Sequence, residues 1–261
     1  MWKKVENRPI GVFDSGIGGL SVLAKIIKVL PNEKYIYFAD TENVPYGVKT
    51  NNQIKKYVKQ AVDFLISKNV KAIVIACNTA TSVAIEDLRK NYNIPIIGIE
   101  PAAKPAVEKR HNKKVLLMAT PVTVREEKLK KLLKKVDTEH SVDLLAMPEL
   151  VKFAEKGEFE SKDVEEYIKK QLKDYKLEEY SELVLGCTHF PFFRETLRKI
   201  FPNNVQIIDG GYGVANRLKD ILENKEEIGN SQLEITYYYS GKKVDNASEL
   251  DKMNRLLSII K

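Results

Sequence analysis

The chain has 261 residues, of which 43% are hydrophobic and 30% charged, so it can fold around a core as one large domain or as two lobes of about 100–150 residues each. No apolar run reaches the roughly 18–20 residues of a membrane helix, and residues 1–6 lack the apolar segment of a secretory signal, so we expect a cytoplasmic protein. The net charge of +7 includes many lysines on helix faces such as 127–136, where leucines form the buried stripe. We therefore expect no nucleic-acid partner and no membrane partner.

In chain order, short apolar runs alternate with amphipathic helical patterns. Strands are expected at 10–13, 34–39, 72–76 and 94–98, with helices at 20–30, 50–68 and 79–91. The alternation then restarts, with strands at 114–118, 141–146 and 183–186 and helices at 124–135, 161–177 and 193–201. After Gly211 we expect a long helix and a final short strand at 233–239. This alternation indicates an α/β fold with parallel sheets flanked by helices.

The third strand of each set ends in the same way. Residues 72–76 run into Cys77-Asn78-Thr79, and the later strand runs into Cys187-Thr188-His189. The two cysteines are 110 positions apart, close to the 104 positions that separate the opening strands at Ile10 and Lys114. We infer a duplicated α/β unit, with two similar lobes related by a pseudo-two-fold axis and the active site between them.

We place the lobe boundaries where the chain would cross between the two units. The first lobe is expected to contain residues 1–99 and the returning segment 210–261, and the second lobe residues 100–209. The crossings would lie near Pro101 and at Asp209-Gly210-Gly211.

Cysteine usage is the first chemical clue. Two cysteines and three histidines exclude a disulfide framework and a four-thiolate metal site, so we expect no metal. Both cysteines should lie at the carboxyl ends of parallel strands, where ligands bind. Each also precedes a predicted helix N-terminus, which favours thiolate over thiol. Donor side chains for a ligand follow at the same strand ends, namely those of Asn78, Thr79 and Thr188.

Two further side chains are chemically suited to work with these thiols. Asp14 ends the first strand and should reach the same cleft as Cys77, and His189 can exchange a proton with Cys187. Inverting a carbon centre through a carbanion needs a base on one face and an acid on the other, and the two roles swap with direction. A pair of thiols that face each other provides both, without a cofactor.

Other interpretations of the same residues remain open. The cysteines can form a redox pair, although catalytic dithiols usually lie close in sequence, or can be inert core residues. Gly16-x-Gly18-x-x-Ser21, with Asp40 further on, resembles a dinucleotide fingerprint. However, its third glycine is Ser21, and Asp14 would place a negative charge near a pyrophosphate. The alternative is a tight turn that lets the backbone approach a small ligand, with Asp40 capping the following loop.

Five segments in order along the chain resemble those of the glutamate racemases, the cofactor-independent bacterial enzymes that make D-glutamate for peptidoglycan. They are FDSGIGG at 13–19, ADTENVPYG at 39–47, ACNTA at 76–80, GIEP at 98–101 and LGCTH at 185–189. The Gly-Cys-Thr-His form favours glutamate racemase over its aspartate relatives. The resemblance covers nearly the full length.

The resemblance implies a role for each matching residue. Cys77 would act on the α-proton of D-glutamate with help from Asp14, and Cys187 on that of L-glutamate with help from His189. The residues implied to hold the substrate are Asp14, Ser15, Tyr46, Gly47, Asn78, Thr79, Thr188 and His189, with Thr123 as a weaker candidate. Without the resemblance, Tyr46 would be interpreted as a packed tyrosine in a turn.

Some positions depart from the family's pattern. Met147-Pro148 stands where a Cys-Pro dipeptide is usual. Glu155, seven residues further on, aligns with an acidic residue implicated in catalysis, the alternative being a solvated helix carboxylate. Asp209 is followed by glycine where serine is usual, which should affect the hinge more than the chemistry.

The resemblance implies glutamate as the substrate and no cofactor. We also expect a homodimer, although the sequence does not show which faces would pair. Three rival functions remain: an aspartate or other amino-acid racemase of the same architecture, a non-catalytic amino-acid binding protein, and an NAD-dependent oxidoreductase.

Overall fold

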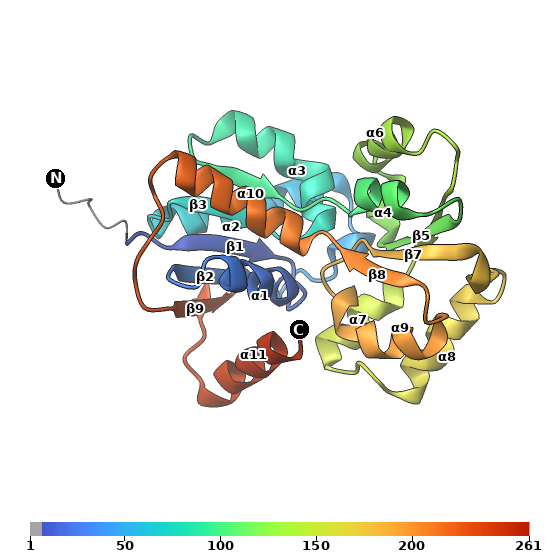
Figure 1. Cartoon of the computed structure of the whole chain (residues 1–261). Helices are drawn as coiled ribbons and strands as arrows, with labels where there is room; N and C mark the ends of the chain where they lie inside the picture. Colours follow the sequence, from blue (N-terminus) through green and yellow to red (C-terminus); the bar gives the residue numbers. More distant parts are fainter. Residues whose placement is uncertain (1–6, 261) are drawn as a thin grey trace.

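The computed structural model describes residues 7–260, and its strands form two sheets in two lobes (Figure 1). Residues 1–6, on which the expectation about a secretory signal rests, lie outside the described residues. No helix in the described part of the chain is both long and apolar enough to cross a membrane.

The first sheet has the strand order β10-β9-β2-β1-β3-β4. Its strands are β1 (Ile10–Asp14), β2 (Lys34–Ala39), β3 (Ala72–Ile75), β4 (Ile96–Gly98), β9 (Glu234–Tyr239) and β10 (Lys242–Lys243). All neighbours pair parallel except the short β10, which is antiparallel to β9. Every residue of β1 and β3 is buried, as expected for parallel strands covered on both faces.

The second sheet has the order β6-β5-β7-β8 and is parallel throughout. Its strands are β5 (Lys114–Ala119), β6 (Val142–Ala146), β7 (Tyr180–Leu185) and β8 (Gln206–Asp209). The order β6-β5-β7-β8 repeats β2-β1-β3-β4 of the first sheet. The matching order confirms the predicted fold of two similar α/β lobes, and it makes β3 and β7, the strands before the two cysteines, equivalent.

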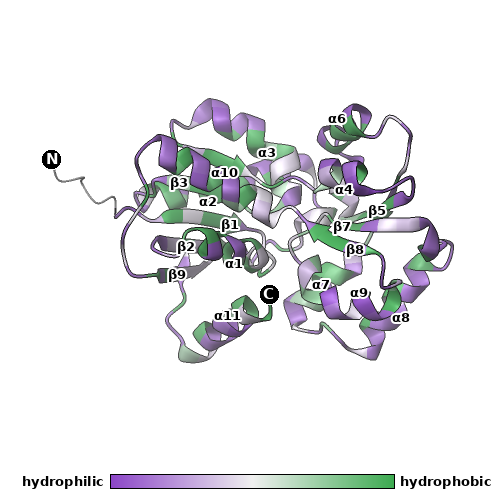
Figure 2. Cartoon of the chain, in the orientation of Figure 1, coloured by the Kyte–Doolittle hydropathy of each residue, from purple (hydrophilic) through white to green (hydrophobic). Residues whose placement is uncertain are grey.

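Helices cover both faces of each sheet (Figures 1 and 2), with their apolar sides turned to the strands. On the first sheet, α1 (Leu20–Val29), α10 (Gly211–Asn224) and α11 (Ala247–Ile259) pack on one face, and α2 (Asn51–Ser67) and α3 (Asn78–Asn91) on the other. On the second, α4 (Ala103–Lys109), α5 (Pro121–Arg125) and α6 (Glu127–Val136) lie opposite α7 (Pro148–Lys156), α8 (Lys162–Leu172) and α9 (Arg194–Ile200). The 3-10 turns are Tyr46–Val48, Leu177–Glu179 and Phe190–Phe193.

Several predicted elements differ from the structure in the second lobe and the tail. The single helix expected at 124–135 is two helices, because Glu126 adopts an extended conformation between α5 and α6. The helix expected at 193–201 begins as a 3-10 turn at Phe190. The returning segment adds β9 beside β2, as expected, but the predicted last strand is followed by β10 and α11. Helices α4 and α7 were not predicted because their apolar patterns are only two turns long.

The two chain crossings between the lobes lie against each other. A Cβ atom at Gly210 would be 2.3 Å from the backbone oxygen of Glu100, so only glycine permits this approach. An almost fully buried ion pair, Lys25 of α1 with Asp209, joins the first lobe to the second crossing. The boundaries after residues 99 and 209 stay predictions.

Candidate active site

The loop after β1 places a buried carboxylate between the lobes. Asp14 is the last residue of β1 and has no exposed surface; its Oδ1 accepts a hydrogen bond of 2.9 Å from the Gly16 amide. Burial raises the pKa of Asp14 to about 6, although the charge of His189 and the hydrogen bonds from Gly16 and Thr188 act in the opposite direction. The result is a carboxylate that can take up a proton close to neutral pH.

Cys77 follows β3 and is the N-cap of α3. Its sulfur accepts a hydrogen bond from the Ala80 amide at 3.4 Å and lies 3.6 Å from the Ser15 hydroxyl. Burial raises the pKa of the Cys77 thiol, and the Asp14 carboxylate adds to the rise. The helix N-terminus does act on this sulfur in the predicted direction, through Ala80, but burial outweighs it and the pKa of the thiol stays above its usual value.

Cys187 has different surroundings. The prediction that it precedes an α-helix is wrong: the 3-10 turn Phe190–Phe193 follows it, and α9 begins only at Arg194. The Cys187 sulfur instead lies 3.7 Å from Nδ1 of His189, and both residues are buried. The group that can exchange a proton with this thiol is therefore an imidazole.

Glu155 supports that imidazole from α7. Its Oε1 lies 2.6 Å from Nε2 of His189. Burial opposes the protonation of His189, but its contacts with Cys187 and Glu155 outweigh this and hold the pKa of His189 well above its usual value. Burial alone would raise the pKa of Glu155, yet the hydrogen bond and charge of His189 hold it below its usual value. Glu155 is thus a partly buried ion-pair partner of His189, with a side chain that is 20% exposed, and not a fully solvated helix carboxylate.

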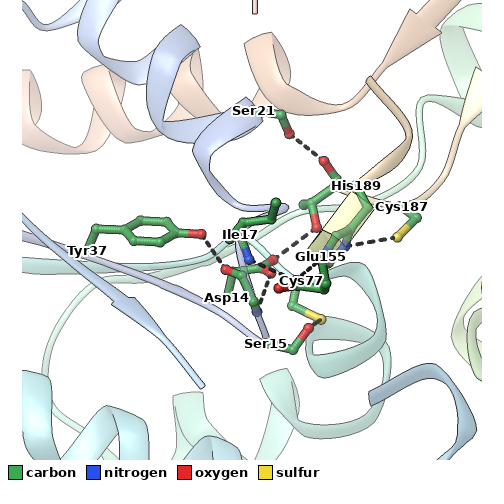
Figure 3. A network of polar contacts seen from close by, with 11 residues as sticks. Asp14, Ser15, Ile17, Ser21, Tyr37, Cys77, Glu155, Cys187 and His189 are labelled. Atoms are coloured by element: carbon green, nitrogen blue, oxygen red, sulfur yellow. Dashed lines mark hydrogen bonds and ion pairs between the residues drawn. The ribbon is translucent and has the colours of Figure 1, made fainter. Parts of the chain in front are cut away.

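The glycine loop of the first lobe packs directly on these second-lobe groups (Figure 3). The Ile17 amide donates to Oε1 of Glu155 at 2.9 Å, and the Thr188 hydroxyl donates to Oδ2 of Asp14 at 3.0 Å. A Cβ atom at Gly18 would lie 2.5 Å from both the Thr188 hydroxyl and Nδ1 of His189. The glycines therefore allow the backbone to approach side chains of the opposite lobe. This is the tight turn expected from the sequence as the alternative to a dinucleotide-binding loop.

Three threonine hydroxyls meet at a second contact between the lobes. Thr79 of α3 lies 2.9 Å from Thr120 and 3.3 Å from Thr123, which are 3.0 Å from each other. A Cβ atom at Gly47 would lie 2.7 Å from that of Thr120, so this loop also closes against the second lobe. Each hydroxyl has one proton to donate and can turn it toward an anion. Thr120 was not predicted; its sequence signal is its equivalence to Ser15, one residue after the first strand of its lobe.

Tyr46 is buried and faces away from this contact. Its hydroxyl donates to Oδ2 of Asp40 at 2.5 Å, and its ring lies 6.2 Å from that of Phe13. Asp40 also accepts hydrogen bonds from Asn43 and Ser240, which makes it the cap of the 40–46 loop. Any contact of Tyr46 with a substrate would have to come from its backbone.

Asn78 faces a cavity between the lobes. The cavity holds about 280 Å³ and is lined by residues of α3 and α6, with Asn78 and Thr123 among them. The amide oxygen of Asn78 is buried and has no hydrogen-bond partner within residues 7–260. A buried acceptor without a partner indicates a missing donor.

The structure thus gathers the predicted residues into two neighbouring groups. Asp14, Ser15 and Cys77 lie with Thr188, His189, Glu155 and Cys187 in the network of Figure 3. Thr79, Thr123 and Gly47 form the second contact. The sequence did not single out Tyr37, whose hydroxyl donates to the Gly16 carbonyl at 2.7 Å, or the Ile17 amide.

Comparison with known proteins places this site in a family. Residues 10–216 match the family described as Asp/Glu/Hydantoin racemase. The chain belongs to this racemase family. It is 49% identical over 253 residues to glutamate racemase 2 of Bacillus subtilis (strain 168), covering 96% of each chain. The expectation of an isomerase of the racemase type is confirmed.

Solved structures of the racemase family agree. The glutamate racemase of Francisella tularensis subsp. tularensis SCHU S4, in complex with D-glutamate, has a TM-score of 0.83 and 30% identity, over 97% of this chain and 95% of that one. The Escherichia coli glutamate racemase, in complex with L-glutamate and the activator UDP-MurNAc-Ala, has a TM-score of 0.77 and 34% identity, over 83% of each chain.

Proposed function

We propose that the protein is a cofactor-independent glutamate racemase that moves the α-proton between two cysteines, Cys77 and Cys187. The observation that carries this is the pair of buried thiols at equivalent strand ends of two duplicated lobes, with His189 beside the Cys187 sulfur and the Asp14 carboxylate acting on the charge of Cys77. With D-glutamate, the Cys77 thiolate takes the α-proton and the Cys187 thiol returns one to the opposite face. With L-glutamate the roles are exchanged.

The neighbours supply and remove the protons of the thiols. Asp14, ionised above about pH 6, accepts the proton that Cys77 must lose before it can act as a base. His189 carries a proton at neutral pH and stands 3.7 Å from the Cys187 sulfur, so it can deliver that proton to the thiolate. Glu155 holds the imidazole in place through its other nitrogen.

The remaining polar groups suit the two ends of glutamate. The unpartnered amide oxygen of Asn78 would accept a hydrogen bond from the ammonium group. The three hydroxyls of Thr79, Thr120 and Thr123 would rotate their protons toward a carboxylate. The Ser15 hydroxyl, beside the Cys77 sulfur, would bind the other carboxylate.

The proposed product is D-glutamate for peptidoglycan synthesis, supported by the resemblance to bacterial racemases with that role. We propose that two lobes close on the substrate, one made of residues 1–99 and 210–261 and the other of residues 100–209. We also propose that the protein assembles as a homodimer.

The test is proton exchange without added cofactor. The purified protein is incubated with D-glutamate in deuterated buffer containing a chelator, and the α-proton is followed by NMR. Loss of the signal with appearance of L-glutamate is expected. A parallel incubation with D-aspartate addresses the rival racemase: exchange of aspartate alone would reassign the substrate, and retention of both α-protons despite binding would make the protein a binding protein.

A further inference from the structure

Ser21 stands at the position where the dinucleotide pattern would have its third glycine, and the proposed proton transfer does not use it. It lies in the first turn of α1 and is 1% exposed. Its hydroxyl donates a hydrogen bond of 2.8 Å to the backbone carbonyl of Thr188, which belongs to the opposite lobe. A side chain of one lobe thus holds the backbone of the other inside the site.

The segment that it holds carries both chemical groups of the second lobe. Thr188 lies between Cys187, the proposed base for L-glutamate, and His189, its proton partner. The segment is fixed within its own lobe by the Gly186 amide, which donates to the Met118 carbonyl at 2.7 Å, and by the Phe190 amide, which donates to the Cys187 carbonyl at 3.1 Å. These bonds hold its ends and leave the peptide group of Thr188 to the first lobe.

Thr188 is held from the first lobe at two atoms. Its hydroxyl donates to Asp14 and its carbonyl accepts from Ser21. A Cβ atom at Gly18 would clash with the Thr188 hydroxyl and the His189 ring, so the glycine loop lies close against these side chains. The Ser21 bond ties the Thr188 carbonyl to the same lobe. A rotated Thr188 peptide would change the position of both the Cys187 sulfur and Nδ1 of His189.

The hydroxyl of Ser21 bonds to the backbone of the 187–189 segment and not to Cys77 or Asp14. In Figure 3 it lies at the opposite end of the network from Ser15 and Cys77. It donates to a backbone carbonyl and not to a side chain of the site, so it can influence the reaction only through the 187–189 segment.

We propose that Ser21 is a positioning residue that fixes the Cys187-Thr188-His189 segment against the first lobe for proton transfer at Cys187. The inference rests on the proposed two-thiol racemisation of glutamate. A neutral hydrogen bond of this kind corresponds to a loss of about three- to tenfold in kcat/KM when it is removed.

The test compares Ser21→Ala with Ser181→Ala. Ser181, at the start of β7, donates a bond of the same length, 2.8 Å, to the Arg110 carbonyl, but within the second lobe and at the other end of its strand. Both variants lose one hydroxyl-to-carbonyl bond, so their melting temperatures show how much stability the loss of such a bond costs. We expect kcat/KM to fall about three- to tenfold in Ser21→Ala and to stay within twofold of the unsubstituted protein in Ser181→Ala.

The primary α-deuterium isotope effect shows whether a loss of kcat/KM comes from poorer positioning or from a smaller fraction of folded enzyme. In Ser21→Ala, kcat/KM must fall equally in both directions, because the equilibrium constant of racemisation is one. The step at Cys187 becomes more rate-limiting, so the primary effect of α-deuterium should rise with L-glutamate and fall with D-glutamate. A loss of folded enzyme would change neither isotope effect.

Ser21→Cys keeps the shape of the side chain, with a larger atom and a weaker donor. It is expected to show the same opposite changes with a smaller loss, and it serves if Ser21→Ala does not fold. Equal behaviour of Ser21→Ala and Ser181→Ala, or unchanged isotope effects in the Ser21 variant that folds, would overturn the inference. Failure of the unsubstituted protein to exchange the α-proton of glutamate would overturn the proposed function instead.

Discussion

The surroundings of Cys77 and Cys187 differ more than their sequences suggest. Cys77 caps an α-helix, receives a hydrogen bond from the Ala80 amide and has a carboxylic acid, Asp14, as its proposed proton partner. Cys187 precedes a 3-10 turn and has an imidazole as its partner, held by Glu155. Duplication explains why the thiols occupy equivalent strand ends, whereas their proton partners come from different places in the two lobes.

In the proposed mechanism, this difference means that the two proton transfers are tuned separately. On the Cys77 side, burial raises the pKa of both the thiol and the carboxyl. On the Cys187 side, an ion pair keeps the imidazole protonated. Substitutions near Cys77 and near Cys187 should therefore be distinguishable. Each should make proton abstraction rate-limiting for a different enantiomer of glutamate.

The largest effect is expected from the thiols themselves. Cys77→Ser and Cys187→Ser should each lower kcat/KM by about 10³-fold or more, because a serine hydroxyl is a far weaker acid and general acid–base catalysis contributes about 10²–10⁴-fold. Racemisation followed by polarimetry provides the measurement. Full activity in either variant would exclude the two-thiol mechanism.

The next largest effect on kcat/KM is expected from the proton partners, Asp14 and His189. Their variants test directly whether each partner serves its own thiol. Asp14→Asn and His189→Asn should each lower kcat/KM by about 10²-fold, equally in both directions. The α-deuterium isotope effect should rise with D-glutamate in Asp14→Asn and with L-glutamate in His189→Asn. The same pattern in both variants would show that the two residues are not assigned to separate thiols.

Glu155→Gln should have a smaller effect on the Cys187 side. It removes the charge that holds the proton on His189 and weakens the 2.6 Å bond to Nε2, and hydrogen bonds to charged groups contribute about 1.5–3 kcal/mol. We expect about a tenfold or greater loss of kcat/KM and a lower pKa of His189 by NMR titration. An unchanged imidazole titration would contradict the ion pair.

The pH profile tests Asp14. With a pKa of about 6, the carboxyl is ionised and able to accept a proton above that pH. We expect kcat/KM to fall by about tenfold per pH unit below pH 6 in the unsubstituted protein. Asp14→Asn should lack this acid limb in its residual activity; an identical limb in both proteins would assign it to another group.

The smallest effect is on stability and has the opposite sign to the effect on activity. Because the pKa of Asp14 is raised from 3.8 to about 6 on folding, the folded protein binds more protons than the unfolded chain between these values. The carboxyl's contribution to stability is therefore present below about pH 4 and is lost as the pH rises toward and through 6. We expect Asp14→Asn to raise Tm by a few degrees at pH 8 relative to the unsubstituted protein, and less at pH 4.5. A lower Tm at pH 8 would mean that the lost bonds to Gly16 and Thr188 matter more.

The sequence predicted most of the fold because its strands are nearly continuous apolar runs between turn residues. The repeated Cys-containing strand ends indicated the duplication, which the equal strand orders of the two sheets confirm. The short helices α4 and α7 were missed because tertiary contacts, more than their own patterns, stabilise such short segments. The interruption at Glu126 depends on one backbone conformation that no residue there signals.

The sequence singled out many of the residues that the structure brings together, but not the contacts between them. The strand ends identified Asp14, Cys77 and Cys187, because parallel strands bring their carboxyl ends together. That Glu155 lies on His189 follows from the packing of α7 beside the Phe190–Phe193 turn, a contact between segments 34 residues apart. The raised pKa of Cys77 also could not be predicted, since it depends on burial that the sequence does not quantify.

The pairing of β9 with β2 has a consequence for biosynthesis. All four strands of the second sheet have been translated once β8 is made, but β2 lacks its outer neighbour until residues 234–239 follow. A nascent chain therefore holds all the strands of one sheet while the other sheet still lacks a strand. The edge of β2 stays open to other extended chains until β9 has been made.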